Sequence, residues 1–270
     1  MTSLAAYVTR DKERVAGWFA RIDSQIFAEL LTWQNAAGIG GGVAEIGVHH
    51  GKSFIALCLG LVDDQRAYAI DLFDDQARNR DGSGRGDRAV FERHLRDFGV
   101  SGRAAVIDAR GSDEVTAHEI RKGVGDVRFF SIDGGHWRAI VASDLRLAAE
   151  VLVDGGVIAL DDFLRPEWPD VSAGFFDWFE HGPGTIVPFA IGYNKLYLCH
   201  EPRVAELQGC LERSAFLKHF LGKHYEFCGR LVPVFQTYPL PEWGLRRRMR
   251  EYLKVYHPDL YVRLRDLLGR

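Results

Sequence analysis

From Gly42 onwards, short runs of apolar residues alternate with longer stretches in which apolar and polar residues recur at helical spacing. The short runs predict strands at residues 43–46, 67–72, 104–108, 127–133 and 156–160. The longer stretches predict the helices between them, at residues 52–61, 87–98, 113–121 and 137–152. Strands that alternate with helices in this way form a mostly parallel sheet whose two faces are covered by crossover helices.

The pattern changes after the fifth strand. A helix is expected at residues 171–180, followed by apolar runs at 185–191 and 195–199. Only Gly-Tyr-Asn at positions 192–194 separates these runs, a spacing typical of a β-hairpin. The expected fold is therefore α/β: a doubly wound, mostly parallel seven-stranded sheet over residues 42–200, whose last strand is antiparallel.

Helical additions are expected on both sides of this sheet. Residues 1–41 form a lead in which segment 11–37 has apolar side chains at helical spacing, and core packing is its expected role. Residues 201–270 are expected to form a helical extension that ends in a basic amphipathic helix from Glu242. A solvated face or a dimer contact explains that helix better than a membrane or nucleic-acid surface does.

Composition narrows the classes of partner. The formal net charge of -3 and the pI near 6.4 give no overall attraction for nucleic acid or anionic membranes. Charged residues at positions 10–14 stand where a signal peptide has its apolar stretch, and no run of about 18 apolar residues occurs. The four cysteines lack the CxxC spacing of zinc sites and the density of disulfide scaffolds. We therefore expect a soluble cytoplasmic protein with no membrane span and no nucleic-acid partner.

A turn with two glycines joins the first predicted strand to the first helix, in the segment EIGVHHGKS at residues 45–53. Gly47 and Gly51 there let a nucleotide or a carboxylate approach backbone amides at a helix N-terminus. The GxxxG spacing differs from the GxGxxG fingerprint of dinucleotide binding, which weighs against a nicotinamide or flavin cofactor. Glu45 is expected to reach the amino-acid part of the cofactor, the alternative being a helix cap.

Polar residues also follow the next two strands. Asp71 ends the second strand, where a carboxylate can accept hydrogen bonds from both ribose hydroxyls of a nucleotide. Ser112 follows the third strand and is expected either near an adenine ring or as an ordinary helix cap. Between them, residues 79–86 read NRDGSGRG, a charged, glycine-rich loop that suits a mobile lid or a solvated insertion.

Carboxylates gather where the fourth and fifth strands end, at Asp133 and at the pair Asp161 and Asp162. Because the carboxyl ends of parallel strands meet at one edge of a sheet, these three groups should converge and would repel one another without a compensating cation or proton. Hard oxygen ligands in this number favour magnesium, or a similar divalent cation, over zinc. The alternative is that they cap turns or lie solvated at strand ends.

These residues resemble a known family, the metal-dependent class I O-methyltransferases of the macrocin and mycinamicin type, which methylate sugar hydroxyls. Its IDGxH motif is matched by residues 132–136 and its DD pair by residues 161–162, while residues 45–51 match the E/DxGxxxG motif of methyltransferases. The resemblance spans residues 42–199. One member of the family, which this chain also resembles, methylates a mannose unit of a methylated polysaccharide. One departure is the His49 and His50 pair, where the family more often has small or aromatic residues.

The resemblance implies roles for particular residues. S-adenosylmethionine would be bound by Glu45, Gly47, Gly51, Ser53, Asp71, Ser112 and Asp133. Magnesium would be bound by Asp133, Asp161 and Asp162. His136 would be the general base, because sugar enzymes of the family have histidine three residues after the first metal aspartate, where catechol-type relatives have lysine.

The expected acceptor is therefore a hydroxyl of a small molecule or oligosaccharide. A sugar hydroxyl ionises far above pH 7, so a divalent cation and a histidine of near-neutral pKa together suit the reaction. Three other functions stay open: a phenol or catechol methyltransferase, a catalytically silent cofactor-binding assembly protein, and a nicotinamide-dependent oxidoreductase. A homodimer is the expected assembly.

Overall fold

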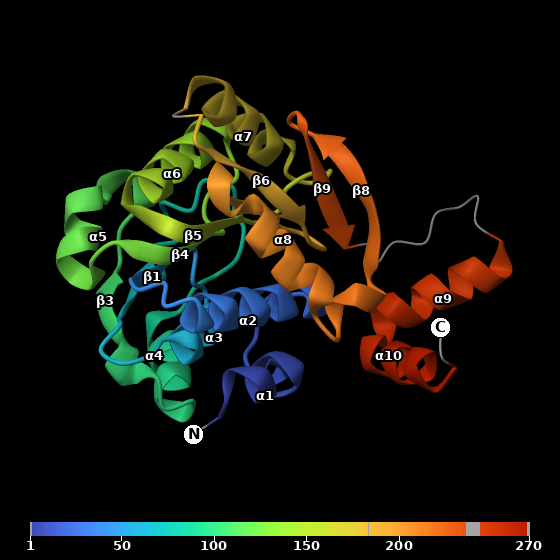
Figure 1. Ribbon diagram of the computed structural model, residues 1–270. Coiled ribbons are helices and arrows are strands. Elements are labelled where there is room, and N and C mark those ends of the chain that lie inside the picture. The colour runs from blue at the N-terminus through green and yellow to red at the C-terminus, as the bar shows by residue number, and fades with distance from the viewer. Residues whose placement is uncertain (1, 183, 236–243, 269–270) are drawn as a thin grey trace.

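A twisted sheet with strand order β3-β2-β1-β4-β5-β7-β6-β9-β8 forms the centre of the structure, a computed structural model that describes residues 2–182, 184–235 and 244–268 (Figure 1). Its strands are β1 (Gly42–Ile46), β2 (Ala67–Ile70), β3 (Ala104–Asp108), β4 (Val127–Ile132), β5 (Leu152–Leu160), β6 (Ile186–Ile191), β7 (Leu196–His200), β8 (Leu221–Phe227) and β9 (Arg230–Phe235). The first five strands pair in parallel, and β7 runs antiparallel between β5 and β6. The predicted α/β class, a doubly wound and mostly parallel sheet, is confirmed.

Helices cover both faces of the sheet. They are α1 (Leu4–Thr9), α2 (Arg21–Ala36), α3 (Phe54–Gly60), α4 (Arg88–Asp97), α5 (Ala117–Val124), α6 (Arg138–Val151), α7 (Pro169–His181) and α8 (Val204–Arg213), with α9 (Leu245–Tyr256) and α10 (Pro258–Leu267) at the C-terminal end. Side chains of α1 to α4 and α8 join one core cluster, and those of α5 to α7 join the other.

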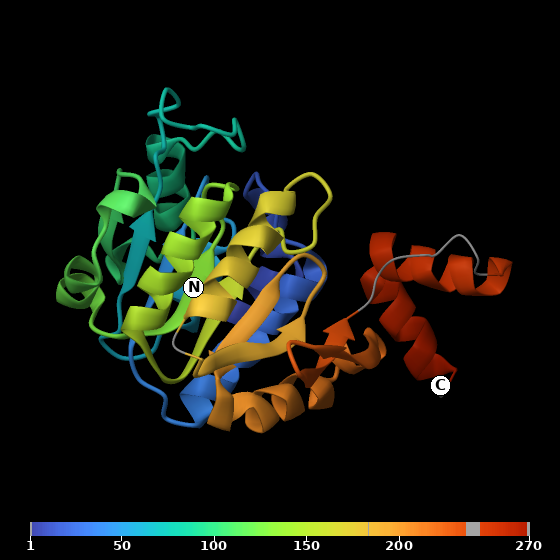
Figure 2. The same cartoon turned by 90° about the horizontal axis from the view of Figure 1, so that it is seen from above.

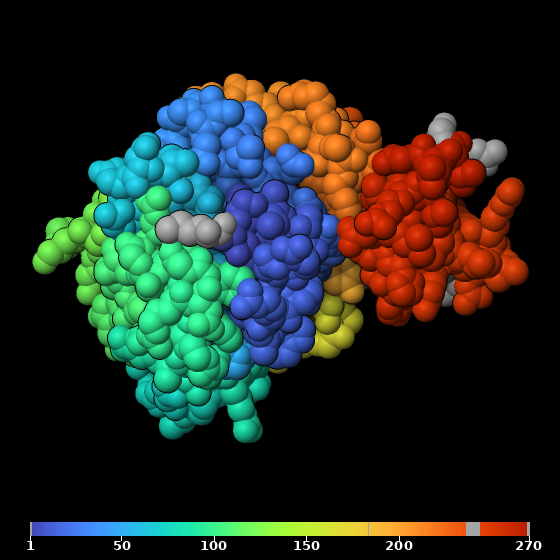
Figure 3. Space-filling view, turned by 90° about the horizontal axis from the view of Figure 1, so that it is seen from below, coloured from blue at the N-terminus to red at the C-terminus, as the bar shows by residue number. Residues whose placement is uncertain are grey.

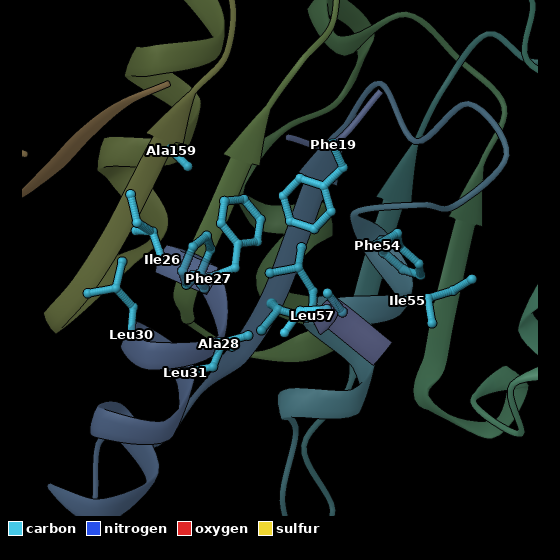
Figure 4. Packing of buried hydrophobic residues seen from close by; sticks show 14 of the residues in the cluster. Phe19, Ile26, Phe27, Ala28, Leu30, Leu31, Phe54, Ile55, Leu57 and Ala159 are labelled. Carbon is cyan, nitrogen blue, oxygen red and sulfur yellow. The ribbon is translucent and has the colours of Figure 1, made fainter. Parts of the chain in front are cut away.

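The two clusters follow from the alternation of side chains along buried strands. Phe129 and Phe130 are neighbours in β4, yet Phe129 packs in the first cluster and Phe130 in the second, and both are fully buried. A strand with two buried faces needs apolar residues at nearly every position, which is why the central strands appear in the sequence as continuous apolar runs. Figure 4 shows the first cluster, where Phe27 of α2 packs on Phe19 with 4.9 Å between ring centroids.

The N-terminal lead differs from the single helix expected over residues 11–37. The chain forms α1, a short 3-10 helix at Asp11–Arg14, and then α2, because Gly17 adopts a positive φ of 126° that ends helical structure between them. The expected core role is confirmed for α2, whose Phe27, Leu30 and Leu31 are fully or almost fully buried.

The C-terminal extension is not purely helical, and within the described residues the sheet has nine strands instead of the expected seven. β8 and β9 form an antiparallel hairpin whose two-residue turn, Cys228 and Gly229, has positive φ at both positions. Such a turn normally carries Asn-Gly or Asp-Gly, so Cys-Gly gave no turn signal in the sequence. Glu242, where the basic helix was expected to begin, lies outside the described residues, and α9 begins at Leu245.

The helix expected at residues 113–121 begins later in the structure. A 3-10 turn occupies Ser112–Glu114, and α5 starts only after Thr116, whose hydroxyl accepts from the amide of Glu119 while the Glu119 carboxylate accepts from the amide of Thr116. This capping box fixes the start of α5 four residues later than the apolar spacing suggested. Across the described ranges, none of the helices has the length and apolar character needed to cross a membrane.

Candidate active site at the carboxyl ends of the strands

The carboxyl ends of β1, β4 and β5 lie at the same edge of the sheet. Ile132 of β4 pairs with Ile46 on one side and with Leu160 on the other. Each strand therefore ends at the same level, and the residues that follow stand side by side. A Cβ on Gly47 would lie 1.7 Å from the carbonyl oxygen of Asp133, so this position needs glycine because a neighbouring strand end is so close.

Asp133, His136 and Asp162 converge at this edge. Each offers one ligand atom, and these atoms lie within 4.8 Å of one another. Burial and the neighbouring charge of Asp161 raise the pKa of Asp133 well above its usual value. Burial would also raise the pKa of Asp162, but hydrogen bonds from His136 and Asn194 outweigh it and lower that pKa.

The imidazole of His136 is held on three sides. Its Nε2 lies 3.0 Å from Asp162 Oδ2, its Nδ1 lies 2.8 Å from Asp81 Oδ2, and its ring stacks on Trp168 with 4.2 Å between centroids. Asp81 also accepts a hydrogen bond from the backbone amide of His136 at 2.8 Å. Burial would lower the pKa of His136, but the hydrogen bonds to Asp162 and Asp81 outweigh burial and raise it. The ring orientation is thus fixed by two carboxylates and one indole.

Asp81 belongs to the glycine-rich loop at residues 79–86, which projects at the top of Figure 2 (the teal loop). A Cβ on Gly86 would meet Asp71 Oδ1 at 2.8 Å, and one on Gly84 would meet the ring of His49 at 3.6 Å. The loop therefore contacts the glycine turn as well as His136. These contacts place the loop against the site, and its movement as a lid stays a prediction.

Asp161 takes part in a different set of contacts. Its Oδ2 accepts a hydrogen bond from Lys195 Nζ at 2.7 Å, and its Oδ1 accepts from Asn194 Nδ2 at 2.8 Å. Burial would lower the pKa of Lys195, but the carboxylates of Asp161, Asp133 and Asp23 raise it above its usual value. A buried ammonium therefore balances one of the three carboxylates that the sequence suggested would need a cation.

Of the two acids expected to bind the cofactor, Asp71 is bonded to the glycine turn and Glu45 to the neighbouring strand β4. Glu45 is fully buried and accepts a hydrogen bond from Ser131 Oγ at 2.8 Å, and burial raises its pKa to about 7. Asp71 accepts hydrogen bonds from the amides of His49 at 2.7 Å and Phe73 at 2.6 Å. The structure thus places Asp71 against an amide of the turn, and Glu45 in β1 just before the turn.

The remaining predicted cofactor residues lie on the same side of the sheet edge. Gly51 has a φ of 92°, and a Cβ there would lie 3.0 Å from the ring of Phe91. Ser53 is buried directly before α3. Ser112 does not cap α5. Burial raises the pKa of the Asp144 carboxyl group to about 7, and the nearby Ser112 hydroxyl partly offsets this rise.

Sequence reasoning missed Asp81 and Lys195 as parts of the site, and it considered Trp168 only as an aromatic residue at the rim that could stack on a sugar ring. One signal for Lys195 was present: the hairpin after α7 returns an antiparallel strand, and Leu196 pairs with Leu160. The residue before Leu196 therefore falls opposite Asp161, and a lysine there marks an ion pair. Asp81 and Trp168 come from connections whose course over the sheet has no periodic signal.

Part of the chain is similar to a known family of domains. Residues 44–163, which contain most of the residues named above, match the family model described as a methyltransferase domain. No curated protein sequence matches the chain.

Solved structures show the same fold. The chain is similar to the O-methyltransferase NovP, with 15% identity, coverage of 65% of this chain and 78% of that one, and a TM-score of 0.54. It is also similar to an O-methyltransferase from Bacillus cereus in complex with SAH, with 15% identity, coverage of 72% and 89%, and a TM-score of 0.50. The sheet and helices therefore adopt the Rossmann-like class I methyltransferase fold.

Proposed function

We propose that this chain, an enzyme with a methyltransferase domain at residues 44–163, transfers the methyl group of S-adenosylmethionine to a hydroxyl of a sugar or oligosaccharide. The observation that carries the proposal is the group Asp133, His136 and Asp162, whose ligand atoms lie within 4.8 Å of one another beside the Gly47 turn. Ligands of open α/β sheets collect at this edge, so a base and two carboxylates meet the bound molecules there.

The turn and its neighbours are the residues that would hold the cofactor. S-adenosylmethionine supplies a methyl group that is already activated, so the protein mainly has to align the acceptor oxygen. Gly47 and Gly51 shape the turn, and Asp71, with its two backbone hydrogen bonds, stands at the end of β2 where a ribose binds in this class of sheet. Glu45, Ser53, Ser112 and Asp133 complete the proposed cofactor set.

The donor set also fits a divalent cation. Asp133 and Asp162 offer carboxylate oxygens, and the buried Oδ1 of Asn194 has no hydrogen-bond partner among the described residues. Magnesium prefers hard oxygen donors of this kind, so these residues would hold it. A bound cation would lower the pKa of an acceptor hydroxyl at the site. Asp161, which the sequence suggested as a third ligand, serves in this proposal to hold Lys195 and Asn194 in place.

His136 is the proposed general base. The Asp81 carboxylate at Nδ1 favours a proton on that nitrogen. With Asp162 turned to a bound cation instead of to Nε2, Nε2 would be free to take the proton from the acceptor hydroxyl as the new oxygen–carbon bond forms and the sulfur–carbon bond of the cofactor breaks. Stacking on Trp168 keeps the ring from turning away. The lid loop excludes water from the site when it lies across the turn.

Acceptor profiling tests the proposed substrate class. With saturating S-adenosylmethionine and magnesium, we expect mass spectrometry to find a methyl group on a mono- or oligosaccharide with neighbouring hydroxyls. Catechol and simple phenols should react at least about tenfold more slowly, a difference of about 1.4 kcal/mol in transition-state stabilisation. Faster transfer to catechol than to any sugar would favour the phenol or catechol alternative.

Replacing Asp81 by Asn should lower kcat by about 10- to 100-fold and leave KM for S-adenosylmethionine within about twofold, because Asp81 orients the base without touching the proposed cofactor residues. Steady-state kinetics with both substrates measures the split. Ser83→Ala is the matched control, since it removes only the Ser83 hydroxyl bond to Asp81 and should keep kcat near the wild-type value. Equal kcat in Asp81→Asn and wild type would restrict Asp81 to holding the loop.

A further inference from the structure

Large apolar side chains are unusually exposed at the C-terminal end of the described chain. Among the residues that the structure describes, fourteen large hydrophobic residues are exposed, and eight of them lie on the helical hairpin formed by α9 and α10 (residues 245–268). They are Leu245, Met249, Tyr252, Tyr256, Leu260, Leu264, Leu267 and Leu268. Figure 3 shows the hairpin as a red lobe beside the rest of the molecule. An apolar surface this concentrated indicates a contact with another molecule.

The spacing of these side chains indicates a helix-packing surface. On α9 they stand at positions 245, 249, 252 and 256, and on α10 at positions 260, 264 and 267. On each helix, intervals of four and three residues place these side chains in one narrow stripe. Helices pack against other protein elements through stripes of this kind. A helix that lies in a membrane surface typically presents a wider apolar face.

The hairpin is attached through a face different from this stripe. Tyr261 is almost fully buried, packs on Phe220 with 5.6 Å between ring centroids, and donates its hydroxyl to the carbonyl of His219 at 3.5 Å. Arg21 of α2 forms an ion pair with Asp259 at 2.9 Å. The exposed stripe is therefore presented in a defined orientation, which reduces the ordering cost of binding.

Charge separates the hairpin from the rest of the chain. Residues 245–268 contain seven lysines and arginines against three acidic residues, a net charge of +4. Residues 1–244 contain 26 lysines and arginines against 34 acidic residues, a net charge of -8. A second copy of this chain thus offers an acidic body that complements the basic hairpin, whereas two hairpins alone would repel each other.

We propose that the hairpin of one copy docks on the acidic body of a second copy, so that a two-fold symmetric dimer exchanges its two C-terminal hairpins. In a two-fold dimer the contact occurs twice, so each molecule gives one hairpin and receives one. Together, the exposed parts of the eight apolar side chains have an area of roughly 800 Å², if a fully exposed large side chain has about 150 to 200 Å². A stable interface needs about 800 Å² from each partner, so the surface is large enough.

Light scattering after size exclusion tests the proposal on the full chain. Wild-type protein at about 10 μM should have the mass of a dimer, and the double variant Met249→Glu, Tyr256→Glu should have the mass of a monomer. Both changes fall on exposed positions, so thermal unfolding followed by circular dichroism should stay within about 3 °C of the wild-type Tm. Leu231→Glu is the matched control. Leu231 is an exposed apolar residue of β9, outside the helical hairpin of α9 and α10, and its replacement should leave the dimer intact.

Three outcomes would overturn the proposal. Wild-type protein could remain a monomer up to about 100 μM, which would show that no such dimer forms. The double variant could remain a dimer, which would place the interface elsewhere. Alternatively, the monomer could bind vesicles of anionic lipid while the double variant does not, which would assign the stripe to a membrane surface.

Discussion

Replacement of His136 by alanine is expected to slow methyl transfer by about 10²- to 10⁴-fold, the usual cost of losing a general base. The proposed role places the proton of the acceptor on Nε2, the ring nitrogen on the Asp162 side. Affinity for S-adenosylhomocysteine should change less than about threefold, because His136 lies beside the acceptor and outside the proposed cofactor set. Single-turnover rates and calorimetry on the same preparation measure both quantities.

A matched control separates chemistry from general damage. His181 is an exposed histidine in the last turn of α7, and His181→Ala should retain the wild-type rate. If His136→Ala keeps more than about a tenth of wild-type turnover, the base lies elsewhere in the site. Loss of S-adenosylhomocysteine binding in His136→Ala would instead assign the residue to the cofactor pocket.

Removal of divalent cations is expected to abolish turnover, and magnesium should restore it. Asp133 and Asp162 carry the proposed cation, and Asp162→Asn should cost more than about 100-fold in rate, since loss of an outer partner of a metal ligand alone typically costs 10- to 100-fold. The same variant should weaken binding of Mn²⁺, followed by electron paramagnetic resonance in the absence of acceptor.

Asp74→Asn is the control for this pair of measurements, because Asp74 is exposed and lies outside the group at the strand ends. It should leave both the rate and the Mn²⁺ affinity unchanged. Full turnover in excess EDTA would remove the cation from the mechanism. Asp133 and Asp162 would then be groups that only position His136.

The sequence predicted the sheet well because central strands have a strong signal. Phe129 and Phe130 face opposite layers and are both buried, so the strand between two helical layers appears as an uninterrupted apolar run. Residues 44–163 match the model of a methyltransferase domain, in agreement with the class predicted from the IDGxH segment and the glycine turn. Its metal and its sugar acceptor stay predictions.

Contacts between distant segments could not be predicted in the same way. Asp81 reaches His136 across 55 positions of sequence, through a loop whose composition indicates mobility but gives no direction. Lys195 could have been recognised from strand pairing, yet the Gly-Tyr-Asn signal before it was interpreted only as a turn. The β8 and β9 hairpin was missed because Cys228 adopts a positive φ that its residue type rarely shows.

These corrections change the proposed chemistry of the site. Three converging aspartates seemed to require a cation, but Lys195 balances Asp161 at 2.7 Å. The remaining pair, Asp133 and Asp162, has His136 beside it. The cation in this account therefore activates the acceptor hydroxyl, while Lys195 contributes most of the charge balance around Asp161.

Isothermal titration with S-adenosylhomocysteine and, separately, with NAD tests the central claim most directly, because both ligands suit a turn followed by Asp71 at the end of β2. The account predicts S-adenosylhomocysteine binding with a dissociation constant in the low micromolar range or better, a free energy of about -7 to -8 kcal/mol, and no heat from NAD. Binding of NAD with no measurable binding of S-adenosylhomocysteine would contradict it.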